Sequence, residues 1–382
     1  MDRPVNDSRP VVAFLTHSAQ LSGAELFLLR VTAAMRRIRP LVVLGEHGPL
    51  EHALVERGVD VEVVELPTTV RSHTGQSRGG ATIGKSLGVV ATVRRTARVL
   101  RARRVAAVTT HSAKAHLYGG LAGRLIRVPV VAHLHGVLGT ADVHRANTVL
   151  LRTVLRTLPS AVIANSRCTA RSLGGRAPVT VVGCPVSIPP HTPVASSDVV
   201  VVGRLSAFKG QDVAIRAFAR ATARAAGPTA PRLRIAGAAL FPRDAAYADG
   251  LRALADQLGV ADRVDFLGHV TDVSTELANA GIAVHASPLP EGFGQVVVEA
   301  MAAGRPVIAS AAGGPAELIE DGVDGLLVPP GDDVALAAAI GRLVDDTALG
   351  DRLGAAARVS ARRFGLDGIV GELEEALLRA CR

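Results

Sequence analysis

Two glutamates that flank a glycine-rich stretch carry the clearest chemical signal in the second half of the chain. The stretch reads Ser287-Pro-Leu-Pro-Glu291-Gly292-Phe293-Gly294-Gln295-Val296-Val-Val-Glu299. We predict a strand before it, a loop that carries Glu291, and a helix that begins near Gly294 and contains Glu299. The glycines let the backbone approach a ligand, and the helix N-terminus offers unpaired N–H groups that suit a phosphate. The carboxylates can accept hydrogen bonds from sugar hydroxyls.

Two other interpretations of Glu291 and Glu299 compete with ligand binding. The first is a plain strand-to-helix turn with two solvated carboxylates. The second is the carboxylate pair of a glycosidase, whose members stand roughly 5–10 Å apart. A helical segment advances about 1.5 Å per residue, which tends to place these two glutamates beyond that range. We therefore favour a binding pair.

A cationic segment opens the second half of the chain. Gly203, Arg204 and Lys209 follow the predicted strand 199–202 and precede the predicted helix 212–226. Arginine gives a planar fork and lysine a compact charge, and both suit a diphosphate leaving group. Lys209 is one of three lysines among 43 basic residues, so composition gives little reason for its presence. The alternative is a pair of exposed surface cations.

Apolar runs alternate with helical patterns along both halves of the chain, which predicts two α/β domains with parallel sheets. The segment 187–198 is rich in proline and small polar residues, and we predict a linker there. In doubly wound sheets, ligands bind outside the carboxyl ends of the strands. We expect strands at Val11–Thr16, Pro40–Leu44, Val61–Leu66, Val105–Thr109, Val128–Leu134 and Ala161–Ala164, then at Val199–Val202, Arg232–Ala236, Val264–Leu267, Ile282–Ala286, Pro306–Ala309 and Gly325–Val328.

Together these motifs resemble glycosyltransferase family 4, the retaining GT-B enzymes. The resemblance is strong over 199–332 and continuous but looser before that. It implies two Rossmann-like doubly wound domains that face a central cleft: 1–190 on the acceptor side and 191–365 for the nucleotide sugar, with a helix at 366–382 that could pack back on the first domain. The motifs are Gly203-Arg204-Leu205 with Lys209-Gly210, Leu267-Gly268, the stretch from Glu291 to Glu299, Gly304-Arg-Pro-Val-Ile-Ala-Ser, Gly313-Gly314-Pro-Ala-Glu317 and Asp321-Gly-Val-Asp-Gly325.

The resemblance assigns roles in the second half of the chain. Arg204 and Lys209 would neutralise the donor diphosphate, and Glu299 would bind the ribose hydroxyls. The donor hexose would contact Glu291 and the backbone of Gly292, Phe293, Gly294 and Gln295, and the phosphate would also meet the N–H groups near Gln295 and Val296. The nucleotide base would lie by Gly237–Ala238 and near Val270, and Gly203 would also belong to the nucleotide-sugar site.

In the first half, the resemblance points to a glycine loop and to strand-end histidines. Gly23 would stand in the glycine loop, where Ser22 replaces the first glycine of many relatives and weakens the assignment. His135 would face the donor, with His133 as the second choice, and His111 would meet the acceptor. The alternative for each of these histidines is a buried ring with its hydrogen bonds satisfied.

The expected mechanism needs no metal and no cofactor beyond a UDP- or GDP-sugar donor. The chain contains no Asp-x-Asp ligand pair, and fixed cations and a helix dipole can stabilise a departing diphosphate. The family implies retention of configuration, with front-face attack by an acceptor hydroxyl on a glycan, a lipid-linked molecule or a small molecule. Two rival classes remain: another sugar-nucleotide enzyme such as an epimerase or a phosphorylase, and a non-catalytic binder of anions.

The net charge of +9 indicates either an anionic partner or the enrichment in arginine that a GC-rich genome produces. The chain lacks tryptophan, zinc-ligand spacing and a helix-turn-helix signature, so we expect no nucleic acid partner. The basic helix predicted at 84–105 could touch the inner face of a membrane, or pack on its own sheet as a surface helix. Three widely spaced cysteines and no recognisable signal peptide favour a cytoplasmic protein.

Overall fold

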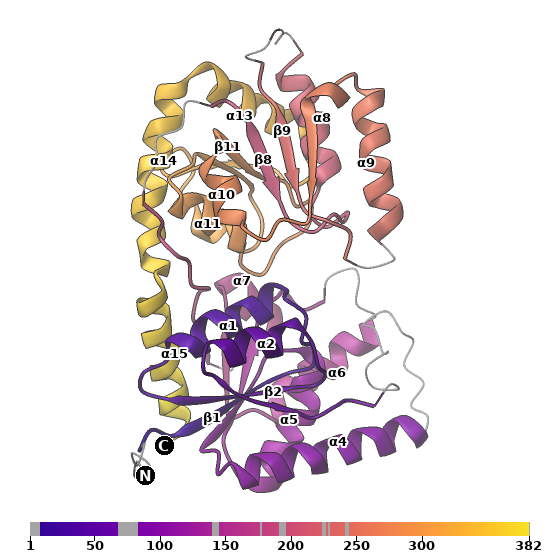
Figure 1. Cartoon of the computed structure of the whole chain (residues 1–382), viewed down its shortest axis with the longest axis vertical. Coiled ribbons are helices and arrows are strands. Elements are labelled where there is room, and N and C mark those ends of the chain that lie inside the picture. The colour runs from indigo at the N-terminus through magenta and orange to yellow at the C-terminus, as the bar shows by residue number, and fades with distance from the viewer. Residues whose placement is uncertain are drawn as a thin grey trace. The chain divides into compact units, whose positions relative to one another are not determined.

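The computed structural model divides the chain into two compact units (Figure 1). Unit 1 comprises the chain up to Pro185 together with 366–382, and unit 2 comprises Val186–Gly365. The boundary thus falls before residue 190, and the predicted linker at 187–198 includes 191–195, which lie outside the described residues. The described residues are 8–67, 83–139, 145–175, 178–190, 196–223, 227, 230–240 and 244–381.

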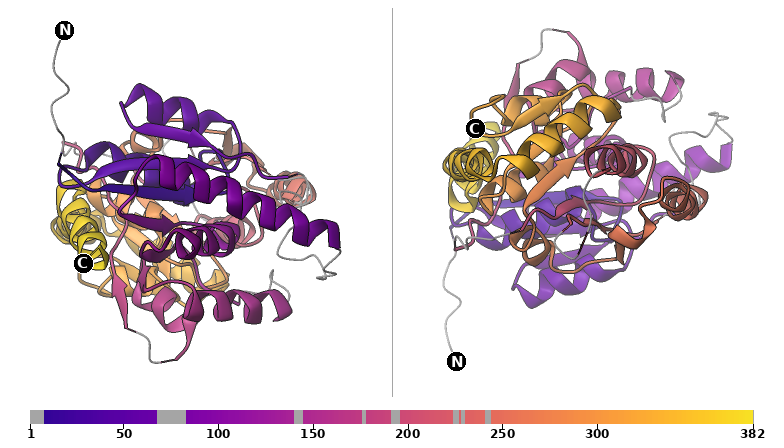
Figure 2. Two further views of the ribbon diagram at one scale, coloured as in Figure 1. Left: turned by 90° about the horizontal axis from the view of Figure 1, so that it is seen from below. Right: turned by 90° about the horizontal axis from the view of Figure 1, so that it is seen from above.

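Unit 1 is a parallel sheet in the order β3-β2-β1-β4-β5-β6-β7, with helices on both of its faces (Figure 2). Valine-rich runs form the strands because side chains on both faces are buried. The strands are β1 (Val11–Thr16), β2 (Arg39–Leu44), β3 (Asp60–Val63), β4 (Ala107–Thr110), β5 (Val130–Leu134), β6 (Ala161–Ala164) and β7 (Val179–Val181). The helices are α1 (Gly23–Ala34), α2 (Pro49–Glu56), α4 (Ile83–Ala102), α5 (Ala113–Ile126), α6 (Arg145–Thr157), α7 (Arg167–Leu173) and α15 (Leu366–Ala380).

Unit 2 repeats the pattern with a parallel sheet in the order β10-β9-β8-β11-β12-β13. Its strands are β8 (Val199–Val202), β9 (Leu233–Ala236), β10 (Val264–Gly268), β11 (Ile282–His285), β12 (Val307–Ser310) and β13 (Leu326–Val328). Its helices are α8 (Gln211–Ala221), α9 (Ala245–Gln257), α10 (Val273–Ala278), α11 (Gln295–Ala302), α12 (Pro315–Leu318), α13 (Asp333–Asp345) and α14 (Thr347–Ala361), with short 3-10 turns at η2 (Ala261–Arg263) and η3 (Arg362–Phe364).

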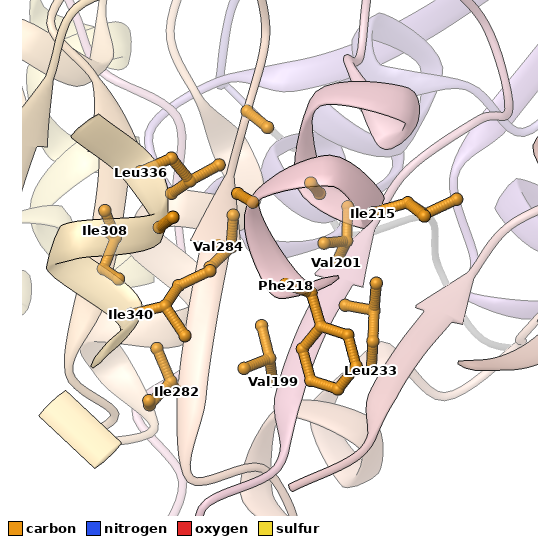
Figure 3. Close-up of a cluster of buried hydrophobic side chains, with 14 of the residues drawn as sticks. Val199, Val201, Ile215, Phe218, Leu233, Ile282, Val284, Ile308, Leu336 and Ile340 are labelled. Atoms are coloured by element: carbon orange, nitrogen blue, oxygen red, sulfur yellow. The ribbon is translucent and has the colours of Figure 1, made fainter. Parts of the chain in front are cut away.

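Alternating residues of the central strands build the core of unit 2. Val199 and Val201 of β8 lie on the same face of the sheet as Ile282 and Val284 of β11 (Figure 3). Phe218 of α8 packs against them and is completely buried. Burial of each such side chain contributes about 1.5–3 kcal/mol, so this layer holds the strands and α8 of unit 2 together.

The order of strands reverses beside β1 in unit 1 and beside β8 in unit 2. Successive connections run outward in one direction from β1 through β3 and then return to β4 on its other side. Unit 2 does the same, with β11 as the returning strand. Loops after two such neighbouring strands diverge and leave a crevice for ligands. The residues after β1, β4, β8 and β11 are therefore the first places to look for a site.

The prediction of two parallel α/β sheets is confirmed, and most strand bounds shift by one or two residues. The sequence missed β7, a three-residue edge strand that is too short for a periodic signal. Helix α8 ends at Ala221, earlier than predicted, and 224–226 lie outside the described residues.

Helix α4 packs most of its apolar stripe against the core of unit 1. Ala97 and Leu100 are buried in the core cluster of unit 1, and Val93 packs against that cluster, whereas Val90 is exposed. The packing favours a surface helix, and membrane contact through 84–105 stays a prediction. Among the described helices, none is both long enough and apolar enough to cross a membrane.

Candidate functional site

Lys209 and Glu291 form an ion pair at the carboxyl ends of β8 and β11. The Nζ atom of Lys209 donates to Oε1 of Glu291 over 2.6 Å. The side chains are 29% and 19% exposed, so solvent screens the pair only in part. The pair lies at the strand reversal of unit 2, and the sequence predicted both residues but not their contact.

Two glycines bring the loops of this pair together. Gly210 directly precedes α8 as its N-cap with φ +66°, and a Cβ there would lie 2.1 Å from the carbonyl oxygen of Ala286. Gly313 has φ +68°, and a Cβ there would lie 2.2 Å from the carbonyl oxygen of Glu291. Only glycine combines this conformation with so close an approach. The loops of Lys209 and Glu291 are therefore held by backbone packing as well as by charge.

Three groups converge on one oxygen of Glu291. Besides Lys209, the hydroxyl of Ser287 donates to Oε1 over 2.5 Å. Nε2 of His285 lies 3.1 Å from the same atom, without the alignment of a hydrogen bond. Burial by itself would raise the pKa of Glu291, but the charge and hydrogen bond of Lys209, together with the nearby ring of His285, outweigh it, and the pKa lies well below its usual value.

The lowered pKa of Glu291 predicts how unit 2 responds to acid. Because the native carboxyl binds its proton less readily than the unfolded one, stability from this group is present above the unfolded pKa of about 4.3 and is lost as pH falls toward the native pKa. We expect the wild-type midpoint of unit 2 to fall more steeply below pH 4.3 than that of Glu291→Gln.

Tyrosine fluorescence measures this response in one unit at a time. The chain has two tyrosines and no tryptophan. Tyr247 lies in unit 2, so a Tyr118→Phe background reports unit 2 alone. Parallel slopes for the wild type and Glu291→Gln between pH 5 and pH 3 would contradict the lowered pKa.

Arg204 contacts a different carboxylate from Lys209. Its Nη1 lies 3.5 Å from Oδ2 of Asp244, the residue before α9. The loop between the two cations is held by the completely buried Gln211, whose side-chain amide donates to the carbonyls of Gly203 and Arg204 over 3.4 and 2.9 Å. The structure thus places Arg204 and Lys209 on one braced loop, each beside a carboxylate.

The N-terminus of α11 follows Glu291 as predicted. Gly294 precedes the helix with φ +90°, and Gln295 is its first residue. Inside the helix, Nε2 of Gln295 donates to Oε1 of Glu299 over 3.1 Å. Gly292 and the buried Phe293 connect Glu291 to this helix, and Val296 is partly buried in its first turn.

Three predicted residues of the nucleotide-sugar site follow neighbouring strands of the same sheet. Gly203, Gly237 and Val270 come after β8, β9 and β10, in that spatial order. The backbone of Gly237 approaches Gly203 so closely that a Cβ would lie 1.9 Å from its carbonyl oxygen. The structure brings these strand ends to one edge of the sheet.

The three predicted histidines of unit 1 lie together. His111 follows β4, His133 belongs to β5, and His135 follows β5, with ring centroids 4.3–5.2 Å apart. The prediction gave His111 to the acceptor and His135 to the donor and did not foresee their contact. Gly23 is exposed at the start of α1, and a Cβ there would meet nothing within 4 Å.

Sequence reasoning missed several partners of these residues. His285, Ser287, Gln211 and Asp244 contact the predicted residues in unit 2. His285 is the last residue but one of the predicted strand 282–286, and Gln211 directly precedes the predicted helix 212–226, so both were visible as residues near a strand end or a helix start. Asp244 follows a segment whose residues 241–243 lie outside the described ones, and no local pattern marked it.

Two family models match the chain, one in each half. The model described as Glycosyltransferase Family 4 matches residues 48–188. The model described as Glycosyl transferases group 1 matches residues 191–360. Together they cover all of the candidate residues except Gly23.

The chain is also similar to solved structures and to curated proteins. The crystal structure of Anabaena HepE in complex with UDP-glucose is 28% identical, with a TM-score of 0.82, and the match covers 97% of this chain and 99% of that one. A D-inositol 3-phosphate glycosyltransferase of Xylanimonas cellulosilytica is 38% identical over 46% of this chain and 40% of its own length. An exopolysaccharide phosphotransferase of Streptomyces coelicolor is 39% identical over 53% of this chain and 21% of its own length. The chain thus matches less than half the length of these two curated relatives.

Proposed function

The chain belongs to glycosyltransferase family 4 with a GT-B fold, and from this premise we propose that it transfers a hexose-type sugar from a nucleoside diphosphate donor to a hydroxyl acceptor with retention of configuration. The single observation that carries the proposal is the braced pair of Lys209 and Glu291 beside the N-terminus of α11. It joins a cation, a carboxylate and a helix N-terminus at the strand reversal of one sheet. A sugar diphosphate needs these three kinds of partner.

The phosphate side of the proposed site consists of Lys209, Arg204 and α11. Cleavage of the anomeric bond leaves a nucleoside diphosphate, and its developing negative charge has to be stabilised. The ammonium of Lys209 has three N–H donors, so it can donate to a phosphate oxygen while it keeps its hydrogen bond to Glu291. The N–H groups at Gln295 and Val296 add the positive end of the helix.

The sugar side of the proposed site consists of Glu291. Its described partners all contact Oε1, so Oε2 can accept a hydrogen bond from a hydroxyl of the donor sugar. Its lowered pKa keeps the carboxylate ionised at neutral pH and therefore able to accept. Glu299, in the next turns of α11, is the proposed partner of the ribose hydroxyls.

In the proposed front-face reaction, the acceptor oxygen forms the new bond to the anomeric carbon as the bond to the diphosphate breaks on the same side. The acceptor proton passes to the departing phosphate oxygen. The residues of the chain position the donor and stabilise the leaving group. The acceptor remains a hydroxyl of a glycan, a lipid-linked molecule or a small molecule.

The donor is proposed to carry UDP, because HepE, which matches this chain along its length, is described in complex with UDP-glucose. A thermal unfolding screen with UDP, GDP, UDP-glucose and GDP-mannose tests this choice, with Tyr247 fluorescence as the probe of unit 2. A ligand at about 100 times its Kd stabilises the folded state by about 2.7 kcal/mol. We expect UDP and its sugar to raise the midpoint and GDP to leave it unchanged.

Product analysis then separates transfer from its rivals. An epimerase would convert the sugar nucleotide without any acceptor, and a phosphorylase would require inorganic phosphate. Sugar transfer requires an acceptor hydroxyl and releases the nucleoside diphosphate. If no nucleoside diphosphate or its sugar shifts the unfolding of unit 2, the proposal is wrong.

A further inference from the structure

A compact cluster of three histidine rings lies at the carboxyl edge of the sheet in unit 1. The backbone explains their meeting: β4 and β5 are parallel neighbours, with Thr110 paired to Ala132. Continuation of this register places His111 beside His133. His135 stands two residues after His133 and so returns to the same face of the chain. The sheet itself therefore brings the three imidazoles together.

The ring nitrogens converge to the separations that a metal ion requires. Nδ1 of His111 lies 2.9 Å from Nε2 of His135. One nitrogen from each of the three rings lies within 4.8 Å of the others. Imidazole nitrogens bind Zn²⁺ at about 2.0–2.1 Å, so two ligands of a tetrahedral ion stand roughly 3.3 Å apart.

His133 supplies an independent sign that a ligand is missing. Its side chain is completely buried, and neither ring nitrogen has a hydrogen-bond partner among the described residues. A buried polar group left without a partner costs about 1–3 kcal/mol. Its flanking residues, Ala132 and Leu134, point to the opposite, apolar face of β5. The buried ring of His133 thus lacks a hydrogen-bond partner among the described residues and lies next to the rings of His111 and His135.

The surroundings of the cluster suit a neutral donor set. Phe27 of α1 packs edge-on against His133 at 4.9 Å between centroids, and Phe14 of β1 stacks on His111 at 5.6 Å. On its far side, Nε2 of His111 lies 3.2 Å from the hydroxyl of Thr109. A hydrogen bond of this kind fixes the tautomer and the orientation of a metal-bound histidine. Burial lowers the pKa of all three histidines.

We propose that His111, His133 and His135 form a binding site for a divalent transition-metal ion, with Zn²⁺ as its occupant. Three imidazoles suit zinc, and a site with three protein ligands keeps a fourth position for water or another ligand. The alternative is a His111–His135 hydrogen bond with His133 buried beside it and no ion. Zinc would bind the nitrogen of His135 that faces His111, so the site leaves the opposite nitrogen for other contacts.

This site does not depend on the proposed sugar transfer, and its test needs no substrate. The full chain, with any purification tag removed, is stripped with a chelator and titrated with Zn²⁺ against a chromophoric competitor. We expect one tightly bound ion per chain and a higher unfolding midpoint in the Tyr247→Phe background, which reports unit 1 through Tyr118. Titration with Co²⁺ should give the visible absorption of a tetrahedral ion.

Variants of the cluster then locate the ion. His133→Gln and His111→Gln should abolish tight binding, and Thr109→Val should weaken it about 10–100-fold. His52→Gln and His269→Gln remove exposed histidines and should leave the stoichiometry unchanged. Persistence of the tight site in His133→Gln would overturn the proposal.

A measurement on the wild type removes the dependence on variants that fail to fold. Nitrogen NMR of a histidine-labelled chain reports each ring directly. We expect Zn²⁺ to move the ring resonances of three buried histidines together. Unchanged ring resonances in the presence of excess Zn²⁺ would overturn the proposal as well.

Discussion

Replacement of Lys209 by alanine is expected to lower the turnover of the proposed sugar transfer by about 100- to 1000-fold, the usual loss when one fixed donor to a developing negative charge is removed. Lys209 lies at the strand reversal of unit 2, and its ammonium is held at 2.6 Å from Glu291. The measurement is steady-state release of the nucleoside diphosphate at saturating donor. Arg216→Ala is the matched control, because it removes an exposed cation of the same region that pairs with Asp212 within α8.

The ion pair complicates the interpretation of Lys209→Ala, because Glu291 loses its main countercharge. Loss of one partner from a buried pair costs about 3–5 kcal/mol, and partial exposure here should reduce this to about 1–3 kcal/mol. A slow enzyme could then be a partly unfolded one. The unfolding midpoint of unit 2 therefore has to be measured on each variant.

A double variant separates the two effects. Removal of both charges in Lys209→Met with Glu291→Gln should recover most of the stability lost in Lys209→Met, since two neutral groups of similar size can replace a pair at little cost. Turnover should stay low, because the ammonium of Lys209 no longer faces the leaving group and only Arg204 and the N-terminus of α11 remain there. Recovery of turnover together with stability would mean that Lys209 acts only on the fold.

The sequence predicted the parts of this site well, because each part is local. A strand end, a glycine-bounded loop and a helix start are all set by neighbouring residues. Glu291, Gly294 and Glu299 therefore stand in the predicted order on the predicted elements. Helix α11 begins directly after Gly294, whose positive φ is a conformation that glycine adopts readily, so the residue type indicates the start of the helix.

The contacts between parts could not be predicted, because they depend on packing between distant segments. Lys209 meets Glu291 because the backbone at Gly210 lies against Ala286. The histidine cluster needs the register of β4 against β5, which no single segment contains. In each case the residue types were visible in the sequence, and the tertiary pairing that gives them chemistry was not.

The last helix shows the same limit at the level of the domains. The sequence left open which unit 366–382 joins, because its amphipathic pattern fits any apolar surface. In the structure, α15 belongs to unit 1 and contacts α1 (Figure 1). One buried carboxylate on α15, that of Glu374, binds the backbone of unit 1.

Glu374 binds three successive backbone N–H groups. Its Oε1 accepts from the N–H groups of Arg36, Arg37 and Ile38 over 2.8, 2.6 and 3.1 Å. The side chain is 3% exposed, and the three donors lie in the turn between α1 and β2. Successive N–H groups of this kind form a concave anion site. The carboxylate of Glu374, near the C-terminus of the chain, thus binds the turn between α1 and β2 in unit 1.

Glu374→Ala is expected to destabilise unit 1 by about 3 kcal/mol, because one buried and two partly buried N–H groups lose the acceptor that α15 supplies, and an unmet buried donor costs about 1–3 kcal/mol. Glu374→Gln keeps one acceptor oxygen and should lose less. Glu375→Ala is the matched control: its side chain is 61% exposed and pairs only with Arg379 at 3.6 Å, so a change within about 0.5 kcal/mol is expected.

Urea unfolding in the Tyr247→Phe background measures this cost, since Tyr118 then reports unit 1 alone. The midpoint of unit 2, followed in the Tyr118→Phe background, should not change, because α15 belongs to unit 1. Equal losses in Glu374→Ala and Glu375→Ala would show that α15 is held by its apolar face alone. A loss confined to unit 2 would show that α15 stabilises the other half of the chain, and the assignment of 366–382 to unit 1 would then be wrong.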